Sequence, residues 1–191
     1  LLEKASADVG ALLNIHGTDT NDIEVTIARA ITNARIVTSS NVLALNTWCF
    51  IAFTYDETNG ILAFFGRLNA SAVESAYATP EVGVGATTTD ALAPLIIGNK
   101  ASAIEAFDGR IAVVGVANTQ WTLGQIKQWQ FRPQKTADMV LFAHYGFNGV
   151  GNQIDFSGNG NVWTVTGATV SQHVPLGAPF GIQDGWVPYV V

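Results

Sequence analysis

Two carboxylates stand two residues apart in the sequence, at Asp22 and Glu24. Residues 22–29 alternate between polar and apolar side chains, so both carboxylates fall on the polar face of a predicted strand. Hydrolysis of a glycosidic bond uses two carboxylates that flank the bond, about 5 Å apart in retaining enzymes. The pair is therefore a candidate for catalysis, although a solvated strand face explains it better.

The histidines and the cysteine form no recognisable motif. His16, His144 and His173 lack the i, i+4 spacing of a zinc site. His144 lies in an apolar stretch, where we expect a hydrogen-bonded core or edge residue. Cys49, the single cysteine, excludes an internal disulfide and is predicted to be a buried apolar residue. Residues 81–86 are rich in glycine but lack the spacing of a dinucleotide-binding loop.

Tryptophans are candidates for binding sugars, because a flat ring can cover the apolar face of a pyranose. Two of the five, Trp48 and Trp129, stand at positions that we expect to face the core. The other three are candidates for exposed platforms: Trp121, Trp163 and Trp186. Packing in the interior is the competing role for each of them.

The elements that position these residues are predicted to be short strands. Runs of apolar residues alternate with clusters of Gly, Thr, Asn and Ser, as in antiparallel β proteins. We predict strands over residues 11–15, 23–29, 34–38, 48–55, 61–67, 95–98, 111–116, 139–145 and 162–170. One irregular strand, or two, is expected between residues 69 and 90.

Two local signals are sharper than the rest. Asn59-Gly60 follows residues 48–55 and predicts a tight hairpin turn, because glycine allows the positive φ that such turns need. Both strands of this hairpin carry apolar residues on both faces, which predicts interior strands covered on both sides. Thr122 and Gln125 fit a helix capping box, and Pro133 ends the predicted helix after about two turns.

Composition limits the class of protein. The chain has 191 residues, of which 48% are apolar and 13% charged, and its net charge is −6. These values exclude intrinsic disorder. The absence of a basic cluster argues against nucleic-acid binding. No apolar run approaches the ~20 residues of a membrane helix.

We therefore predict an all-β fold, a two-sheet antiparallel jelly-roll sandwich with one short helix. We expect residues 1–191 to form one domain, with residues 175–191 as an extended tail or a final strand. Because the sequence begins with Leu1 rather than Met, we expect a processed or partial chain.

Several segments together indicate a family. Residues 46–56 (Asn-Thr-Trp-Cys-Phe-Ile-Ala-Phe-Thr-Tyr-Asp), residues 95–99, the Asp108-Gly109 turn and the short helix stand in a familiar order. In this order the chain resembles laminin G-like domains of the concanavalin A-like lectin/glucanase superfamily, over roughly residues 11–129. Residues 155–168 resemble a stretch that usually opens such domains. Here this stretch is either a late sheet strand of a permuted layout or the start of a second repeat.

The resemblance carries expectations about metal and catalysis. Many members hold calcium in a loop, and the side chains that could supply ligands here are Asp155, Asn152, Asn159 and Asn161. Asx residues beside glycines also form turns for purely local reasons, so Asp155 is a weak candidate. The related glucanases carry Glu-x-Asp-x-x-Glu on one strand. The position three beyond Glu24 is Ile27, so the third carboxylate of that pattern is missing.

The resemblance therefore implies a non-catalytic recognition module, binding a glycan or a protein surface, within a larger surface, secreted or virion protein. The alternative is a structural or assembly domain without a sugar site, and a glycan-cleaving enzyme is a third hypothesis. If the resemblance holds, an extracellular or virion-associated location is expected before a cytoplasmic one. The sequon Asn69-Ala70-Ser71 has meaning only in a chain secreted from a eukaryote.

Overall fold

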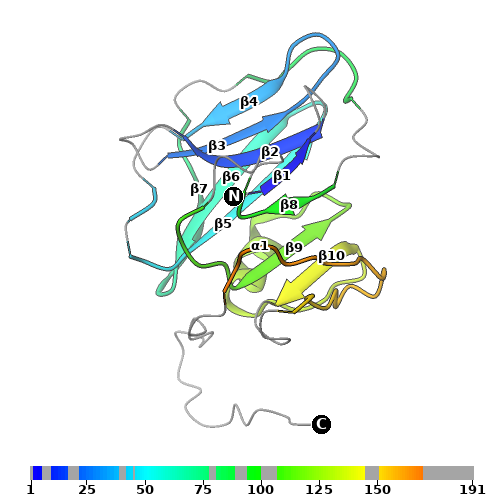
Figure 1. Cartoon of the computed structure of the whole chain (residues 1–191). Coiled ribbons are helices and arrows are strands. Elements are labelled where there is room, and N and C mark those ends of the chain that lie inside the picture. Colours follow the sequence, from blue (N-terminus) through cyan, green and yellow to red (C-terminus); the bar gives the residue numbers. More distant parts are fainter. Residues whose placement is uncertain are drawn as a thin grey trace.

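The structure, a computed structural model, describes residues 2–5, 10–16, 22–38, 42–44, 46–77, 81–88, 94–99, 107–144 and 151–169. Its strands are β1 (Leu2–Ala5), β2 (Gly10–His16), β3 (Asp22–Ile27), β4 (Ala34–Val37), β5 (Cys49–Asp56), β6 (Gly60–Arg67), β7 (Ala70–Glu74), β8 (Ile96–Ile97), β9 (Val113–Ala117) and β10 (Met139–His144). The helix α1 spans Leu123–Phe131 (Figure 1). The fold is all-β with one short helix, as predicted.

The strands form three antiparallel groups. The largest is a five-stranded sheet in the order β4-β3-β2-β1-β8, the second is β5-β6-β7, and the third is the pair β10-β9. Tyr77 and residues 81–87 follow the outer edge of β4 through isolated antiparallel bridges, including Arg35 with Glu81 and Thr32 with Val84. The irregular strand predicted between residues 69 and 90 is thus β7 followed by this edge segment.

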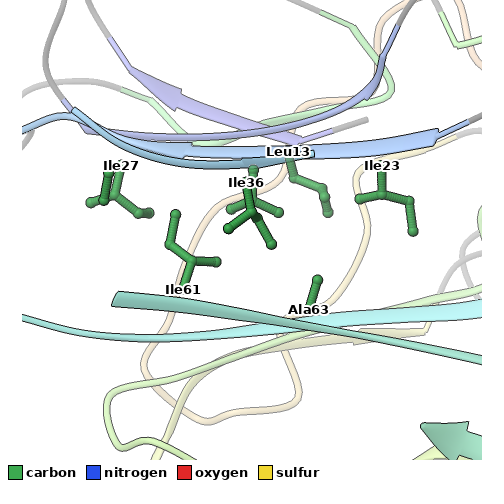
Figure 2. Close-up of a cluster of buried hydrophobic side chains, with 8 residues drawn as sticks. Leu13, Ile23, Ile27, Ile36, Ile61 and Ala63 are labelled. Atoms are coloured by element: carbon green, nitrogen blue, oxygen red, sulfur yellow. The ribbon is translucent and has the colours of Figure 1, made fainter. Parts of the chain in front are cut away.

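The main core lies between the five-stranded sheet and the sheet β5-β6-β7. Figure 2 shows Leu13, Ile23, Ile27 and Ile36 projecting from one layer toward Ile61 and Ala63 of the other. Ile23, Val25 and Ile27 alternate with more polar residues along β3, and all three are at most 5% exposed. The alternation read from the sequence therefore gives the side of the sheet that faces the core.

A second core covers the opposite face of β5-β6-β7. Phe64, Ala72 and Ile126 are buried there, and Phe50, Ala52, Leu62 and Trp121 pack against them. The helix α1 thus lies on the sheet as a further layer, as its short length requires. The hairpin β5-β6 is covered on both faces, as predicted. Within the described residues, however, only β6 lies inside its sheet, and β5 is at the edge.

Turn chemistry explains the two sharp predictions. Gly60 has a φ of +81° at the start of β6, and the Asp56 carboxylate accepts hydrogen bonds from the Thr58 and Asn59 amides. The Thr122 hydroxyl caps α1 by accepting a hydrogen bond from the backbone N–H of Gln125. In return, the side-chain oxygen of Gln125 accepts a hydrogen bond from the backbone N–H of Thr122. Both boundaries follow from local hydrogen bonds, so they could be predicted from local sequence.

One predicted strand is wrong. Residues 162–169 contain no strand, and the Val162 side chain is 85% exposed. A Thr/Val-rich segment needs a neighbouring strand to pair with, and its β propensity alone does not supply one. This segment is therefore not a late sheet strand within its described part. Residues 175–191 lie outside the described residues. No helix of the described residues is long and apolar enough to cross a membrane.

Candidate functional site

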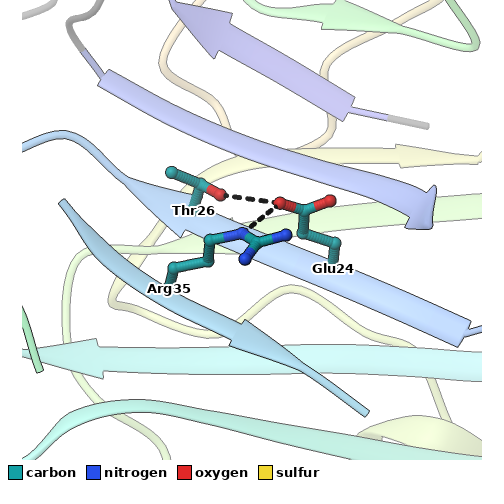
Figure 3. A network of polar contacts seen from close by, with 3 residues as sticks. All are labelled: Glu24, Thr26 and Arg35. Carbon is teal, nitrogen blue, oxygen red and sulfur yellow. Dashed lines mark hydrogen bonds and ion pairs between the residues drawn. The ribbon is translucent and has the colours of Figure 1, made fainter. Parts of the chain in front are cut away.

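The predicted carboxylate pair lies on the outer face of the five-stranded sheet. Figure 3 shows Glu24 between Thr26, on its own strand, and Arg35 on β4. Arg35 Nε donates to Glu24 Oε1 over 2.6 Å, and Thr26 Oγ1 lies 3.5 Å from the same oxygen. The hydrogen bond with Glu24 raises the pKa of the Arg35 guanidinium. Glu24 is therefore held in an ion pair.

Asp22 shares this face with Glu24, as the alternation predicted. Asp22 is 8% exposed, and its Oδ1 atom is buried without a hydrogen-bond partner. The position three residues beyond Glu24 is occupied by Ile27, which is 5% exposed and part of the core. The third carboxylate of the glucanase pattern therefore has no counterpart here.

Asp155 holds the loop that follows β10. Its carboxylate accepts hydrogen bonds from the Phe142 amide over 3.1 Å, from Ser157 Oγ over 2.7 Å and from Asn161 Nδ2 over 2.7 Å. Two further hydrogen bonds come from the backbone N–H groups of Ser157 and Asn161. Burial alone would raise the pKa of this carboxyl, but the hydrogen bonds from Ser157, Phe142 and Asn161 lower it to about 2.

The asparagines of the same loop donate to the edge of β10 that faces away from β9. Asn159 Nδ2 lies 3.1 Å from the carbonyls of both Met139 and Val140, and Asn161 Nδ2 donates to Val140 over 2.9 Å. Side chains thus occupy backbone acceptors that a neighbouring strand would otherwise use. We call residues 155–161 the edge loop.

The edge loop, as arranged, does not fit a calcium ion. Both Asp155 oxygens already accept hydrogen bonds from N–H and O–H groups. Asn159 and Asn161 present their NH₂ groups, whereas calcium binds oxygen. Among the described residues, no three His, Cys, Asp or Glu side chains gather as a metal site would require. Calcium at Asp155 stays a prediction from the sequence, and the local contacts explain these residues without it.

The described tryptophans differ in their surroundings. Trp129 lies among aromatic rings, with centroids 6.2 Å from Phe50, 6.1 Å from Trp121 and 6.0 Å from Phe142. Its packing agrees with the expected core role. Trp48 and Trp163 are half-buried, and Trp186 lies outside the described residues.

Trp121 is half-buried at the start of α1, and its indole nitrogen donates to Asp138 Oδ2 over 2.5 Å. The Thr119 hydroxyl donates to the same oxygen. These hydrogen bonds, that from Thr119 first, hold the pKa of the Asp138 carboxyl far below its usual range. The sequence analysis did not single out Asp138. It stands 17 residues from Trp121, and no periodic pattern connects the two.

A model of the concanavalin A-like lectin/glucanases superfamily, Laminin_G_3, matches residues 4–127. The chain belongs to this superfamily. The match begins at residue 4, whereas the predicted resemblance began near residue 11. It therefore includes part of β1, a strand that the sequence analysis did not predict. We found no match among curated proteins or solved structures.

Membership of the concanavalin A-like superfamily accounts for the sandwich but not for the chain's last described part. The match ends within α1, so β10 and the edge loop lie beyond it. Nevertheless β10 pairs with β9 from Met139 to His144, and Leu141, Phe142 and Ala143 are buried. Residues after the matched region therefore contribute to the packing of this family member.

The remaining residues considered in the sequence analysis are the three histidines, Cys49 and the sequon residue Asn69. The His144 ring lies edge-on to Phe142 with centroids 5.2 Å apart, the His16 side chain is outside the described set, and so is His173. Cys49 is half-buried rather than fully buried, and burial raises the pKa of its thiol despite the nearby Arg67. The sequon residue Asn69 is exposed in the turn between β6 and β7.

Proposed function

We propose that this domain is a non-catalytic recognition module that binds a glycan at the surface around Trp121. The observation that carries the proposal is the pairing of a half-buried indole with the Asp138 carboxylate. Thr119 and Gln120 are exposed beside them. An apolar ring bordered by a few fixed polar groups is the usual composition of a small-molecule site.

Each group would have a defined part in binding. The accessible part of the Trp121 ring offers an apolar surface for the C–H face of a sugar. Asp138 is ionised at physiological pH, as an aspartate ordinarily is, and its lowered pKa keeps it so in mildly acidic solution as well, so its oxygens can accept hydrogen bonds from hydroxyl groups. The indole is already fixed by its hydrogen bond and by the Trp129 ring. A fixed side chain loses little entropy on binding.

The ion pair of Glu24 with Arg35 supports the proposal that the module is non-catalytic. Glu24 is bound to Arg35 through the same oxygen that Thr26 contacts. A retaining glycosidase needs one carboxylate free to attack and a second to transfer a proton. The ion pair engages Glu24 in a structural contact.

A glycan array, run with calcium and with EDTA, tests the proposal. The glycans that bind are then titrated against Trp121→Phe and Asp138→Asn, with Trp48→Phe as the matched control. We expect each site variant to weaken binding roughly tenfold, a value typical of a central aromatic or hydrogen-bonded contact. Trp48→Phe should bind as the unmodified protein does. Binding that survives both site variants, or no binding to any glycan by folded protein, contradicts the proposal.

A second candidate function is assembly with neighbouring subunits, and exposed apolar side chains favour it. Ile31 is 74% exposed and Val84 52% exposed, and the Ile31 amide donates to the Val84 carbonyl, so the two residues are adjacent. Isolated exposed apolar residues are common, but grouped ones mark interfaces. Light scattering across a concentration series tests this candidate. Self-association that Ile31→Lys abolishes would support it, and a monomer at all concentrations would contradict it.

A further inference from the structure

Three asparagines of the chain are followed directly by glycine, at Asn59-Gly60, Asn148-Gly149 and Asn159-Gly160. In such a pair the backbone nitrogen of the glycine can attack the side-chain amide of the asparagine, because glycine has no side chain to hinder the approach. The structure describes the first and the third pair. They lie in different surroundings, and these decide how readily each pair can react.

The two glycines differ in how firmly their backbones are held. Gly60 is buried at the start of β6 and pairs with Asp56 in the antiparallel ladder. Gly160 is exposed, and nothing lies within 4 Å of the position that an added Cβ would take. It forms no hydrogen bond with any residue that the structure describes. The backbone nitrogen of Gly160 is therefore available as a nucleophile, whereas that of Gly60 is enclosed in the hairpin.

The Asn159 side chain would be the reacting group, and it also fastens the edge loop. Its NH₂ group lies 3.1 Å from each of three oxygens, the carbonyls of Met139 and Val140 and the hydroxyl of Ser157. These hydrogen bonds must break before the side-chain carbonyl carbon can turn toward the Gly160 nitrogen. The reaction thus proceeds from molecules in which the edge loop is locally open, and its rate follows the fraction of such molecules.

We propose that Asn159-Gly160 is a site of spontaneous deamidation, and that the reaction releases the edge loop from β10. The Gly160 nitrogen gives up its proton to solvent and attacks Cγ of Asn159, and the new C–N bond closes a five-membered imide. Nδ2 takes up a proton and leaves as ammonia. Water then opens the imide at either carbonyl, which leaves aspartate or isoaspartate at position 159. Nothing is oxidised or reduced, and the site is independent of the glycan surface proposed above.

The product cannot hold the loop as Asn159 does. A carboxylate donates no hydrogen bond, so Met139, Val140 and Ser157 each lose a donor. The new negative charge also lies near the Asp155 carboxylate, because the Ser157 hydroxyl contacts both side chains, and like charges repel. The modification therefore weakens the loop whose closure had limited it, so a loop that has reacted does not close as firmly again.

Peptide mapping by mass spectrometry, over days in mildly alkaline buffer, tests the site. The whole chain is compared with Asp155→Asn, and Asn59 is the internal control in each molecule. We expect conversion at Asn159 to exceed that at Asn59. Asp155→Asn should accelerate conversion at Asn159 about tenfold, because the variant loosens the edge loop. Conversion at Asn59 should be the same in both proteins, since the hairpin β5-β6 lies in another sheet than β10.

Two further variants keep the test decisive. Ser157→Ala, which removes fewer hydrogen bonds, replaces Asp155→Asn if that variant does not fold. Asn159→Asp imitates the product, and its Ser157 and Asn161 backbone N–H groups, which bind Asp155, should exchange hydrogen faster than in the unmodified chain. Conversion at Asn59 equal to or above that at Asn159 overturns the proposal, and so does a rate at Asn159 that the loop variant leaves unchanged. Unchanged exchange in Asn159→Asp would overturn the release of the loop.

Discussion

Replacing Asp155 by Asn is the most direct test of the edge loop. The carboxylate accepts hydrogen bonds from three residues, and its pKa is lowered from 3.8 to about 2. That difference corresponds to about 2.4 kcal/mol of native-state stabilisation, from ~1.4 kcal/mol for each tenfold change in proton affinity. Solvent screening of a half-buried group reduces this to about 1–2 kcal/mol.

The amide group of Asp155→Asn also turns an N–H donor toward the donors of Ser157 and Asn161. We therefore expect a total loss of about 2 kcal/mol, which lowers the Tm by roughly 4–8 °C for a chain of this size. Urea unfolding at pH 7, followed by tryptophan fluorescence, measures the loss. The slope of the transition should not change, because the same surface is exposed on unfolding.

The pH dependence separates this mechanism from a general packing defect. A lowered folded-state pKa gives stabilisation that is present above the ordinary pKa of 3.8 and is lost as the pH falls toward about 2. The difference between the unmodified chain and Asp155→Asn should thus be largest above about pH 5 and shrink between pH 4 and 2. A difference below about 0.5 kcal/mol at pH 7, or one that stays constant down to pH 2, would refute the reasoning.

Substitutions at four further positions should have graded effects on the free energy of unfolding in urea. Gly83→Ala should cost more than about 2 kcal/mol, because φ is +82° and a Cβ would lie 2.6 Å from the Ala34 amide nitrogen. Gly160→Ala, where φ is +72° and nothing lies within 4 Å of the new Cβ, should cost about 1 kcal/mol. Equal losses would contradict the steric argument. Thr122→Ala should lose about 1 kcal/mol and Thr122→Ser little, since the serine hydroxyl can still cap α1. Gln130→Glu should lose roughly 2–3 kcal/mol, because the side-chain NH₂ group of Gln130 donates to two backbone carbonyls over 2.8 and 2.9 Å. A variant as stable as the unmodified chain would show that water replaces these bonds.

Elements fixed by nearby residues could be predicted from the sequence. The alternation along β3, the Asn59-Gly60 turn and the Thr122–Gln125 cap each depend on residues a few positions apart. The sequence pattern therefore contained the physical cause of each element. The same holds for the short length of α1, whose extent ends before Pro133.

Contacts between distant segments could not be predicted in this way. Residues 2–5 combine charged and apolar residues without alternation, and they form a strand because β2 and β8 pair with them. Residues 162–169 have strand-like composition but no pairing partner in the described part of the chain. The Trp121–Asp138 pair joins segments on either side of α1. In each case a tertiary contact decides the outcome, and local propensity does not report it.

Two strand edges of this protein are closed by groups that are not strands of a regular sheet. Tyr77 and residues 81–87 bridge the edge of β4, and the edge loop occupies carbonyls of β10. Open edges are the usual starting points for runaway pairing between copies of a β protein. Copies of this domain could therefore be crowded together, in a tandem array or on a surface, without these edges joining. Association between copies through the surface of Ile31 and Val84 would depend on side chains instead, which single substitutions can adjust.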